Sequence, residues 1–440
     1  MKITPLLTQI RPTYFSVDCG MTYLIRLSDG RFVLIDSSYG EYDEPDKVYD
    51  LMLKQSVSDG IPTVAAWFFT HPHGDHINGF VNMLKKYGDR LRVEKVYYDF
   101  PAYEISSKAC NMPSFLDAIE RTGAETVTPK RGDKIMLADE LFEVLYTASD
   151  FDTAFEDVND ASLVMKIHLG KYTFMMVGDL MPASSKILLS LYSPDELKCD
   201  IMQVAHHGYH GGSHELFSAI DPEIVLWPMP EFRYYEVSPF QCNRYFRQEG
   251  TRIRHIFVSG IEENTFDMTA PIEATVPYTP ERITADFSSK SVRGLGWACI
   301  TGGGMGNEPL DLSFTEEGCE IKTRTLRALL QLVQRGQVKV SDQYRLTMTM
   351  TPEKECETLG LIYDCPTPTT PDSYFPYSLP HKAGETLCVS LSVDRVAKTA
   401  RIDVNGKTEV LPYRADDPCD LILILKDAKL RISEVIFENL

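Results

Sequence analysis

The stretch that decides the fold is Thr70-His71-Pro72-His73-Gly74-Asp75-His76. It follows the apolar run 63–70, and Ile77, Phe80, Val81 and Leu84 then repeat at helical spacing. Imidazole nitrogen and carboxylate oxygen are ligands that suit Zn²⁺, Mn²⁺ or Fe. A strand sends alternate side chains to opposite faces, whereas a tight turn with glycine can direct several to one point. The stretch therefore predicts a metal site on a turn between a buried strand and a helix.

Three further segments end apolar strands in residues that can bind or support a metal. Val33-Leu34-Ile35-Asp36 ends in a carboxylate, and Met175-Met176-Val177-Gly178-Asp179 ends in Gly-Asp. The segment 200–208 (DIMQVAHHG) is an apolar strand that ends in the paired histidines His206 and His207. Strands that alternate with helices predict a layered α/β architecture.

Together these segments resemble the metallo-β-lactamase superfamily, and the resemblance extends over roughly residues 14–270. It implies an αββα sandwich that binds two metal ions, with zinc expected and manganese or iron as alternatives. The metal ligands that it implies are His71 and His73 for the first ion, Asp75, His76 and His207 for the second, and Asp179 between them. Asp36 would orient these ligands by hydrogen bonding, unless it only opens a turn.

The resemblance also implies roles in catalysis. Asp75 would accept a proton from the attacking water while it helps to hold the second metal. Of the paired histidines we favour His207 as the ligand, because adjacent side chains on an extended chain point to opposite sides. His206 would then contact the substrate or donate a proton, with a structural role as the alternative.

One segment departs from the common pattern of the superfamily. Many members supply another histidine to the first metal before the strand that leads to Gly-Asp, but residues 157–164 (DVNDASLV) contain none. The pattern N-[ND]-x-S-L-V is similar to the hydrolase domain of ComEC-type competence proteins and to phosphorylcholine esterases. Asn159 or Asp160 then stands near the place of the missing ligand, and Ser162 is structural. The first metal is expected to bind more weakly, or with water ligands.

The segment that follows His207 leaves two interpretations open. It reads Gly208-Tyr209-His210-Gly211-Gly212-Ser213-His214, where the subgroup commonly has Gly-Ser. Tyr209 could hydrogen-bond a phosphoryl or carbonyl oxygen, and His210 and His214 could line the substrate pocket. A mobile glycine-rich loop with incidental imidazoles is equally consistent with this pattern.

The pattern of the chain changes after its N-terminal part. We expect a hydrolase domain in residues 1–275, a proline-punctuated linker in 276–290 and a mainly antiparallel β domain in 291–440. The last domain faintly resembles laminin-G or concanavalin-like sandwiches, which would make it an interaction module. An amphipathic helix is predicted from Leu326, Leu329, Leu330 and Val333, and Asn405-Gly406 predicts a hairpin.

Composition and short motifs argue against several classes of function. The net charge of -19, with no long basic block, disfavours extended binding to nucleic acid. Ten cysteines without a C-x-x-C pair predict reduced thiols, and Gly302–Gly306 lacks the context of a dinucleotide fingerprint. No apolar run reaches about 18 residues and residues 1–11 lack a secretory pattern, so a cytoplasmic protein that does not enter the membrane is expected.

The candidate ligands predict a metal-dependent hydrolase, and the resemblance to ComEC-type proteins and phosphorylcholine esterases implies that it acts on a phosphodiester or other phosphoester. The substrate would be a small molecule or the end of a polymer. A lactonase or β-lactamase-like amide hydrolase is the first alternative. The second is a glycan- or protein-binding protein that works through its C-terminal domain while the hydrolase fold is idle. The oligomeric state stays open.

Overall fold

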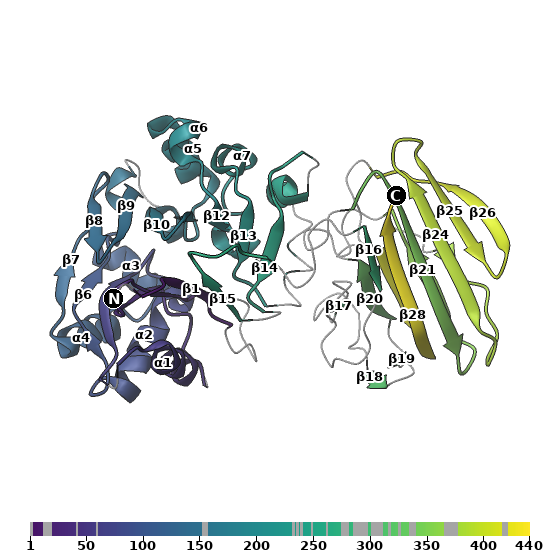
Figure 1. The fold of residues 1–440 in the computed structure, drawn as a ribbon, viewed down its shortest axis with the longest axis horizontal. Helices are drawn as coiled ribbons and strands as arrows, with labels where there is room; N and C mark the ends of the chain where they lie inside the picture. Colours follow the sequence, from purple (N-terminus) through teal and green to yellow (C-terminus); the bar gives the residue numbers. More distant parts are fainter. Residues whose placement is uncertain are drawn as a thin grey trace. The chain divides into compact units, whose positions relative to one another are not determined.

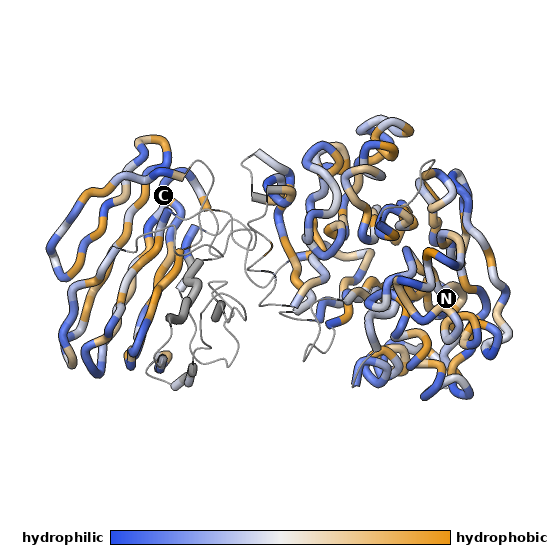
Figure 2. The backbone as a smooth tube through the Cα atoms, turned by 180° about the vertical axis from the view of Figure 1, so that it is seen from behind, coloured by the Kyte–Doolittle hydropathy of each residue, from blue (hydrophilic) through white to orange (hydrophobic). Residues whose placement is uncertain are grey.

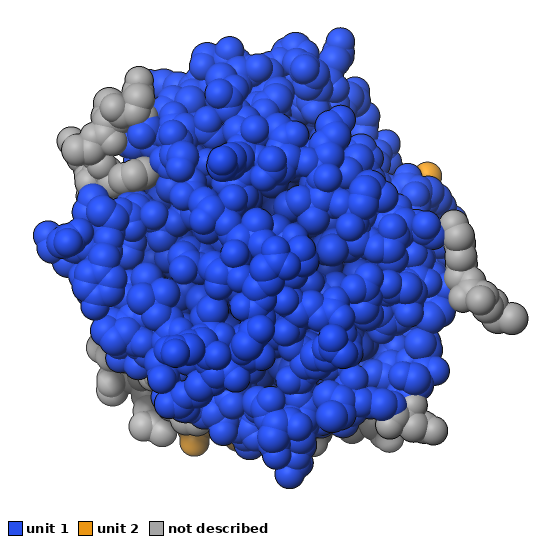
Figure 3. All heavy atoms as spheres, turned by 90° about the vertical axis from the view of Figure 1, so that its left-hand side faces the viewer, with its two compact units in different colours: residues 1–231, 251–273 blue, residues 232–250, 274–440 orange. Residues whose placement is uncertain are grey.

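The computed structural model of the chain divides into two compact units, coloured separately in Figure 3. The first contains residues 1–231 and 251–273, and the second contains residues 232–250 and 274–440. The structure describes residues 3–11, 20–40, 43–58, 60–151, 157–230, 234, 237, 241–247, 250–260, 263–273, 281–284, 298–300, 311–315, 318–323, 327–333, 340–364, 377–415 and 421–440.

The first unit contains two β-sheets that face each other (Figure 1). One has the strand order β15-β1-β2-β3-β4-β6-β7, and β5 also pairs with β4. Its strands are β1 (Leu6–Gln9), β2 (Tyr23–Arg26), β3 (Phe32–Ile35), β4 (Thr63–Phe68), β5 (Arg92–Val93), β6 (Lys95–Tyr97), β7 (Glu125–Val127) and β15 (Asn264–Asp267). The other has the order β14-β13-β12-β11-β10-β9-β8. Its strands are β8 (Lys134–Leu137), β9 (Glu140–Tyr146), β10 (Val164–Leu169), β11 (Tyr172–Met176), β12 (Ile201–Gln203), β13 (Ile224–Trp227) and β14 (His255–Val258).

Helices cover the outer face of each sheet, which gives four layers and confirms the predicted αββα sandwich (Figure 1). The first sheet is covered by α1 (Glu44–Gln55), α2 (Gly74–Tyr87) and α4 (Met112–Thr122), and α3 (Tyr103–Ala109) contacts α4. The second is covered by α5 (Pro182–Leu191), α6 (Pro194–Leu197) and α7 (His214–Ile220). Short 3₁₀ helices are η1 (Ala148–Asp150), η2 (Val158–Ala161), η3 (Ala205–Gly208) and η4 (Gln241–Arg247).

The apolar strand β4 shows how the layers are held together. Trp67 and Phe69 join a buried cluster with Phe80 of α2 and Phe115 of α4. Phe68, between them in sequence, stacks on Phe142 of the opposite sheet with ring centroids 5.4 Å apart. Because successive side chains of a strand point to opposite faces, one uninterrupted apolar run fills both interfaces of this sheet. The strand is thus buried on both sides.

The second unit consists of two antiparallel sheets around one apolar core. The larger has the order β18-β19-β28-β21-β24-β25-β26, with β16 also paired to β28, and the smaller has the order β17-β20-β27-β22-β23. Their strands are β16 (Arg282–Thr284), β17 (Ala298–Ile300), β18 (Asp311–Thr315), β19 (Gly318–Lys322), β20 (Arg327–Val333), β21 (Gln343–Pro352), β22 (Thr358–Ile362), β23 (Tyr377–Ser378), β24 (Leu387–Asp394), β25 (Thr399–Val404), β26 (Lys407–Pro412), β27 (Leu421–Lys426) and β28 (Lys429–Asn439). Polar and apolar positions alternate along β21 and β24, as Figure 2 shows. The mainly antiparallel β domain is confirmed.

Two predictions for this unit had opposite outcomes. Asn405 and Gly406 both have positive φ (51° and 82°) between β25 and β26, as a two-residue type I′ hairpin requires, so the hairpin is confirmed. The predicted helix around Leu329 is wrong, because Arg327–Val333 forms β20 between β17 and β27. A short apolar run fits either state, and two neighbouring strands supply hydrogen-bond partners that the sequence alone does not reveal.

Other predictions fall partly or wholly outside the described residues. Within the predicted linker, the described residues 281–284 include β16, which pairs with β28. Gly302–Gly306 and Leu326 lie outside the described residues. The cysteines found as free thiols are Cys110, Cys199, Cys242, Cys319, Cys356 and Cys388. Among the described helices, none is long and apolar enough to span a membrane.

Candidate metal centre

The predicted ligands follow the carboxyl ends of strands in the first unit. His71 follows β4, Asp179 follows β11, and His207 lies in η3 after β12. His73 is the N-cap of α2, and Asp75 and His76 lie in the first turn of that helix. β3 is parallel to β4, and β11 is parallel to β12. Parallel strands bring the loops at their carboxyl ends to one edge, which is where open α/β sheets bind ligands.

Four of these side chains form one compact group. A ligand atom from each of Asp75, His76, Asp179 and His207 lies within 4.8 Å of the others, and all four residues are buried. The Nε2 atoms of His76 and His207 are 3.2 Å apart. Asp179 Oδ2 lies 3.3 Å from His76 Nε2 and 3.4 Å from His207 Nε2. Asp75 Oδ2 lies 3.6 Å and 3.3 Å from the same two atoms.

Hydrogen bonds behind the cluster fix which nitrogen of each ring faces it. His76 Nδ1 lies 2.8 Å from the Asp36 carboxylate, and His207 Nδ1 lies 2.7 Å from the carbonyl oxygen of Pro228. Since the carbonyl only accepts, and the carboxylate does so when ionised, each Nδ1 must carry the proton. The Nε2 lone pairs of His76 and His207 therefore point at each other and at the two carboxylates, an arrangement that requires a cation or a proton between them.

Asp36 occupies the position that the resemblance implied for it. The residue is buried with φ of 55°, and its carboxylate accepts hydrogen bonds from Thr70 N and Thr70 Oγ1, each at 2.8 Å. Trp67 Nε1 donates to its carbonyl oxygen at 3.0 Å. Thr70 Oγ1 also lies 3.1 Å from His71 Nδ1, so one carboxylate orients His76 directly and His71 through a hydroxyl.

The part of the site formed by His71 and His73 has fewer ligands. His71 Nε2 and His73 Nδ1 are 3.0 Å apart, and His71 Nε2 lies 3.8 Å from Asp179 Oδ2. Among the described residues, Asp179 Oδ1 has no hydrogen-bond partner although it is buried. This oxygen is available to a second cation.

The electrostatics of the site also favour a bound cation. Burial alone would raise the pKa of Asp179, but His207 and His76 outweigh it and hold this pKa well below its usual range. Burial would lower the pKa of His76, but Asp179, Asp75 and Asp36 outweigh it and raise this pKa well above the ordinary value. The carboxylates thus gather positive charge at their centre, and a metal cation can supply that charge in place of the proton on His76.

The spacing of the four-residue group fits a tetrahedral metal. A zinc site with ligands about 2.0–2.1 Å from the metal has ligand atoms about 3.3–3.4 Å apart. The separation between the two histidine Nε2 atoms, and those between each of them and the two carboxylate oxygens, run from 3.2 to 3.6 Å. Two imidazoles and two carboxylates suit Zn²⁺, and Mn²⁺ or Fe could also take such ligands.

The paired histidines lie on a turn, not on an extended strand. His206 and His207 both have left-handed conformations, with φ of 48° and 51°. Our reason for choosing between them, that an extended chain sends them to opposite sides, is therefore wrong. The cluster nevertheless receives the Nε2 atom of His207, while His206 Nε2 lies 3.3 Å from Asn159 Nδ2.

Asn159 and Asp160, the two candidates for the place of the missing histidine, face different ways. Asp160 Oδ1 accepts hydrogen bonds from the backbone N–H and the hydroxyl of Ser184, at 3.2 and 2.6 Å. Asp160 is therefore engaged at the start of α5. Asn159 instead contacts His206 beside the metal cluster.

The loop after His207 stays outside the compact group. Tyr209 N donates to His206 O at 2.6 Å, and the two rings lie 6.1 Å apart. His214 is the first residue of α7. Among the described residues, the group of close ligand atoms includes neither His210 nor His214.

The contacts that hold the Gly-Asp turn were not predicted from the sequence. Gln203 is fully buried; its Oε1 accepts from Val177 N at 3.0 Å and its Nε2 donates to Gly178 O at 2.9 Å. Ser162 Oγ accepts from Asp179 N at 2.9 Å. Gly178 has φ of 55°, and a Cβ there would lie 2.9 Å from Thr70 Cβ, so glycine is required. The signal for Gln203 was a lone amide in an otherwise apolar strand.

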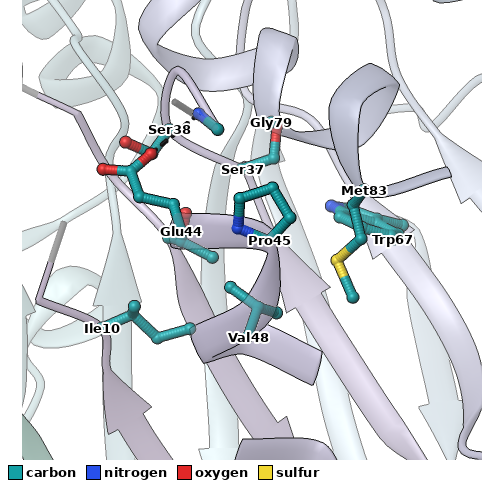
Figure 4. Close-up of a pocket in the computed structure, with 11 residues that line it drawn as sticks. Ile10, Ser37, Ser38, Glu44, Pro45, Val48, Trp67, Gly79 and Met83 are labelled. Atoms are coloured by element: carbon teal, nitrogen blue, oxygen red, sulfur yellow. Dashed lines mark hydrogen bonds between the residues drawn. The ribbon is translucent and has the colours of Figure 1, made fainter. Parts of the chain in front are cut away.

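The structure also contains a hollow beneath α1 (Figure 4). Its walls are mainly apolar and include Val48, Trp67 and Met83. The carboxylate of Glu44 lines one side and accepts a hydrogen bond from Gly40 N at 2.8 Å. No proposed metal ligand lines this hollow, so it is separate from the metal cluster.

Comparison with known proteins supports the assignment of the first unit. Residues 19–227 match the family described as the Metallo-beta-lactamase superfamily. These residues form a metallo-β-lactamase superfamily domain. The ComE operon protein 3 of Bacillus subtilis (strain 168) is 28% identical over 196 residues, which is 42% of this chain and 24% of that protein. The aligned region thus spans about a quarter of the length of this relative.

Solved structures show weaker likenesses. The metallo-beta-lactamase fold protein YhfI from Bacillus subtilis is 13% identical, with a TM-score of 0.34 over 50% of this chain and 85% of that one. The carbohydrate binding module CBM66 from Bacillus subtilis is 9% identical, with a TM-score of 0.24 over 32% of this chain and 94% of that one.

Proposed function

We propose that this chain is a metal-dependent hydrolase that cleaves a phosphodiester or another phosphoester. The observation that carries the proposal is the group Asp75, His76, Asp179 and His207, with its Nε2 atoms turned inward and its ligand atoms at metal-binding separations. Divalent cations held there would lower the pKa of a water toward neutrality and stabilise negative charge that develops on the substrate.

The side chains have distinct roles in this proposal. Asp179 would be shared between two cations, since Oδ2 faces the four-residue group and Oδ1 has no partner among the described residues. Asp75 is the more exposed of the two carboxylates, with 12% of its side chain accessible against 2% for Asp179. Asp75 is therefore the better placed to accept a proton from an attacking water. Asp36 keeps the ring of His76 oriented.

An anionic substrate is favoured by the helix whose N-cap and first turn carry three of the predicted ligands. α2 begins at Gly74, directly after His73, so its N-terminal dipole lies at the cluster. Helix N-termini attract anions, and phosphoryl groups are a common case. The similarity to ComEC-type proteins, through the segment 157–164 and the paired histidines, also supports a phosphoester.

No specific observation supports a ligand of the second unit. The side chains on the outward face of β21, β24 and β25 are small or charged, and no aromatic ring is among them; they include Arg345, Thr347, Ser390, Ser392, Arg401 and Asp403. A large exposed apolar patch, which often marks a binding surface, is not present on this face. Binding of a glycan or a protein there stays a prediction.

The test is elemental analysis of the purified full chain, beside assays with bis-p-nitrophenyl phosphate and a chromogenic β-lactam. We expect one to two equivalents of zinc, manganese or iron and cleavage of the phosphodiester. Cleavage of the β-lactam alone would replace the phosphoester with an acyl substrate. Absence of metal and of activity, also after Zn²⁺ or Mn²⁺ is added, would contradict the hydrolase and favour the binding-protein alternative.

A further inference from the structure

Asn159 and His206 leave buried polar atoms beside the metal cluster without partners. Asn159 is 2% exposed, and its Oδ1 has no hydrogen-bond partner among the described residues. The same holds for His206 Nδ1. Buried polar atoms without partners are uncommon and costly, so each one calls for a specific explanation. Two such atoms on side chains that contact each other point to a common ligand.

The contact between the two side chains determines what they can offer. Asn159 Nδ2 lies 3.3 Å from His206 Nε2. If the amide donates, Nε2 accepts and the ring carries its proton on Nδ1, the atom without a partner. If the amide is turned over, Nε2 donates to it and the amide N–H group becomes the donor without a partner. In both orientations the pair presents one N–H donor and one acceptor.

The backbone holds this pair next to Asp179 from two sides. His206 N donates to Gly178 O at 3.1 Å, directly before Asp179 in the sequence. On the other side Ser162, at the end of η2 that carries Asn159, accepts from Asp179 N. His206 also keeps a left-handed conformation, with φ of 48°, which few residues other than glycine adopt. A Cβ at Gly211 would lie 2.4 Å from His206 Cβ, so the loop closes tightly on this residue.

We propose that Asn159 and His206 act as one substrate-binding pair, which donates a hydrogen bond to a non-bridging oxygen of a phosphoryl group. This inference rests on the proposed phosphoester activity and identifies the side chains that would hold the anionic group. The hydrogen-bond acceptor of the pair can then accept from a hydroxyl group of the same ligand or from a water bound to it. Asn159 thus stands near the place of the histidine that many superfamily members supply to the first metal. Its function here is to orient His206.

The test measures the binding of inorganic phosphate to the zinc-loaded full chain by isothermal titration calorimetry. The variants are Asn159→Ala and His206→Asn, because asparagine tolerates a left-handed conformation better than most residues. The matched control is His168→Asn, in which a residue of β10 loses the imidazole that pairs with Glu143 of β9, outside the cluster. Zinc content by mass spectrometry and the unfolding temperature are measured for every variant.

We expect both variants to weaken phosphate binding about tenfold, which corresponds to about 1.4 kcal/mol, with unchanged zinc content. The double variant should lose little more phosphate affinity than the weaker-binding of the two single variants, because the two side chains act as a unit. The control should bind phosphate like the wild type. Because the two substituted residues lie in separate elements, either variant is sufficient for the test if the other fails to fold.

Three results would overturn the inference. Wild-type affinity in the folded variants would remove the pair from the substrate site and leave the hydrolase proposal standing. A loss of zinc in step with the loss of phosphate affinity would make Asn159 or His206 a metal ligand instead. If the zinc-loaded wild type cleaves a chromogenic ester or lactam but binds no phosphate, both the pair and the phosphoester proposal fail.

Discussion

The two parts of the metal centre differ in how completely the chain surrounds a cation. The part formed by Asp75, His76, Asp179 and His207 supplies four ligand atoms, and both its histidines are oriented from behind. The other part supplies His71 and His73, whose Nε2 and Nδ1 atoms lie 3.0 Å apart, and it shares Asp179 with the first part. Structural zinc sites are typically closed by four protein ligands, whereas catalytic sites keep an open position. The difference therefore predicts a tightly held cation in one part and an exchangeable one, open to water and substrate, in the other.

Asp179 is common to both parts, so its loss should have the largest effect. Asp179→Asn keeps the shape of the side chain but removes the charge placed between the cations. We expect kcat/KM to fall by at least about 100-fold, beyond the 10–100-fold typical of residues that only support ligands. Metal analysis should show loss from both parts, and the circular dichroism spectrum should stay unchanged. Wild-type turnover by this variant would mean that Asp179 does not bridge.

Removing one histidine from each part should separate them. We expect His207→Ala to lose the cation that the wild type retains through dialysis against a weak chelator. His73→Ala should retain that cation and bind only the exchangeable one more weakly. His210→Ala is the control from the neighbouring loop and should lose less metal than either variant. Greater loss from His73→Ala than from His207→Ala would reverse the assignment of the tight part.

Removal of the two cations by chelators should lower the thermal stability of the protein to different extents. A ligand present at 100 times its Kd stabilises the native state by about 2.7 kcal/mol, so stripping the tight cation should lower Tm by roughly 5–10 °C. Stripping only the exchangeable cation should lower Tm by much less. Differential scanning calorimetry after mild and strong chelation, with metal content measured in parallel, tests this. Equal decreases in Tm on removal of the two cations would mean that the two parts hold their cations equally tightly.

The sequence predicted the strands and turns of the first unit well because its signals are local. The turn 70–76 follows a buried strand, and its seven residues contain a glycine and four candidate ligands. The choice of His207 depended on a backbone that the sequence does not reveal. His206 and His207 adopt left-handed conformations stabilised by contacts with Gly178 and Trp227, which are distant in sequence. The chosen residue does join the cluster, although the stated reason was wrong.

The weaker predictions share one physical cause. Apolar residues around Leu329 repeat at a spacing that fits a helix, but pairing with β17 and β27 gives a strand. Gln203 was not predicted as a site residue, because its importance lies in hydrogen bonds to Val177 and Gly178, which directly follow the neighbouring strand β11. Both depend on partners far along the chain, which periodicity and motif spacing cannot identify.

Gln203 offers the smallest and most selective test, because it acts on the metal centre only through the backbone around Gly178. Gln203→Leu keeps the volume but removes the hydrogen bonds to Val177 N and Gly178 O. We expect metal affinity to fall about tenfold, the low end of the range for groups that support ligands. The matched control is Gln55→Leu, since Gln55 is also buried but bonds Thr8 at the end of α1, away from the cluster. Both variants should lose stability on chemical denaturation, but only Gln203→Leu should release metal more readily to a competing chelator. Equal metal affinity in the two variants would mean that the Gly-Asp turn holds its shape without the glutamine, leaving Ser162 as its main support.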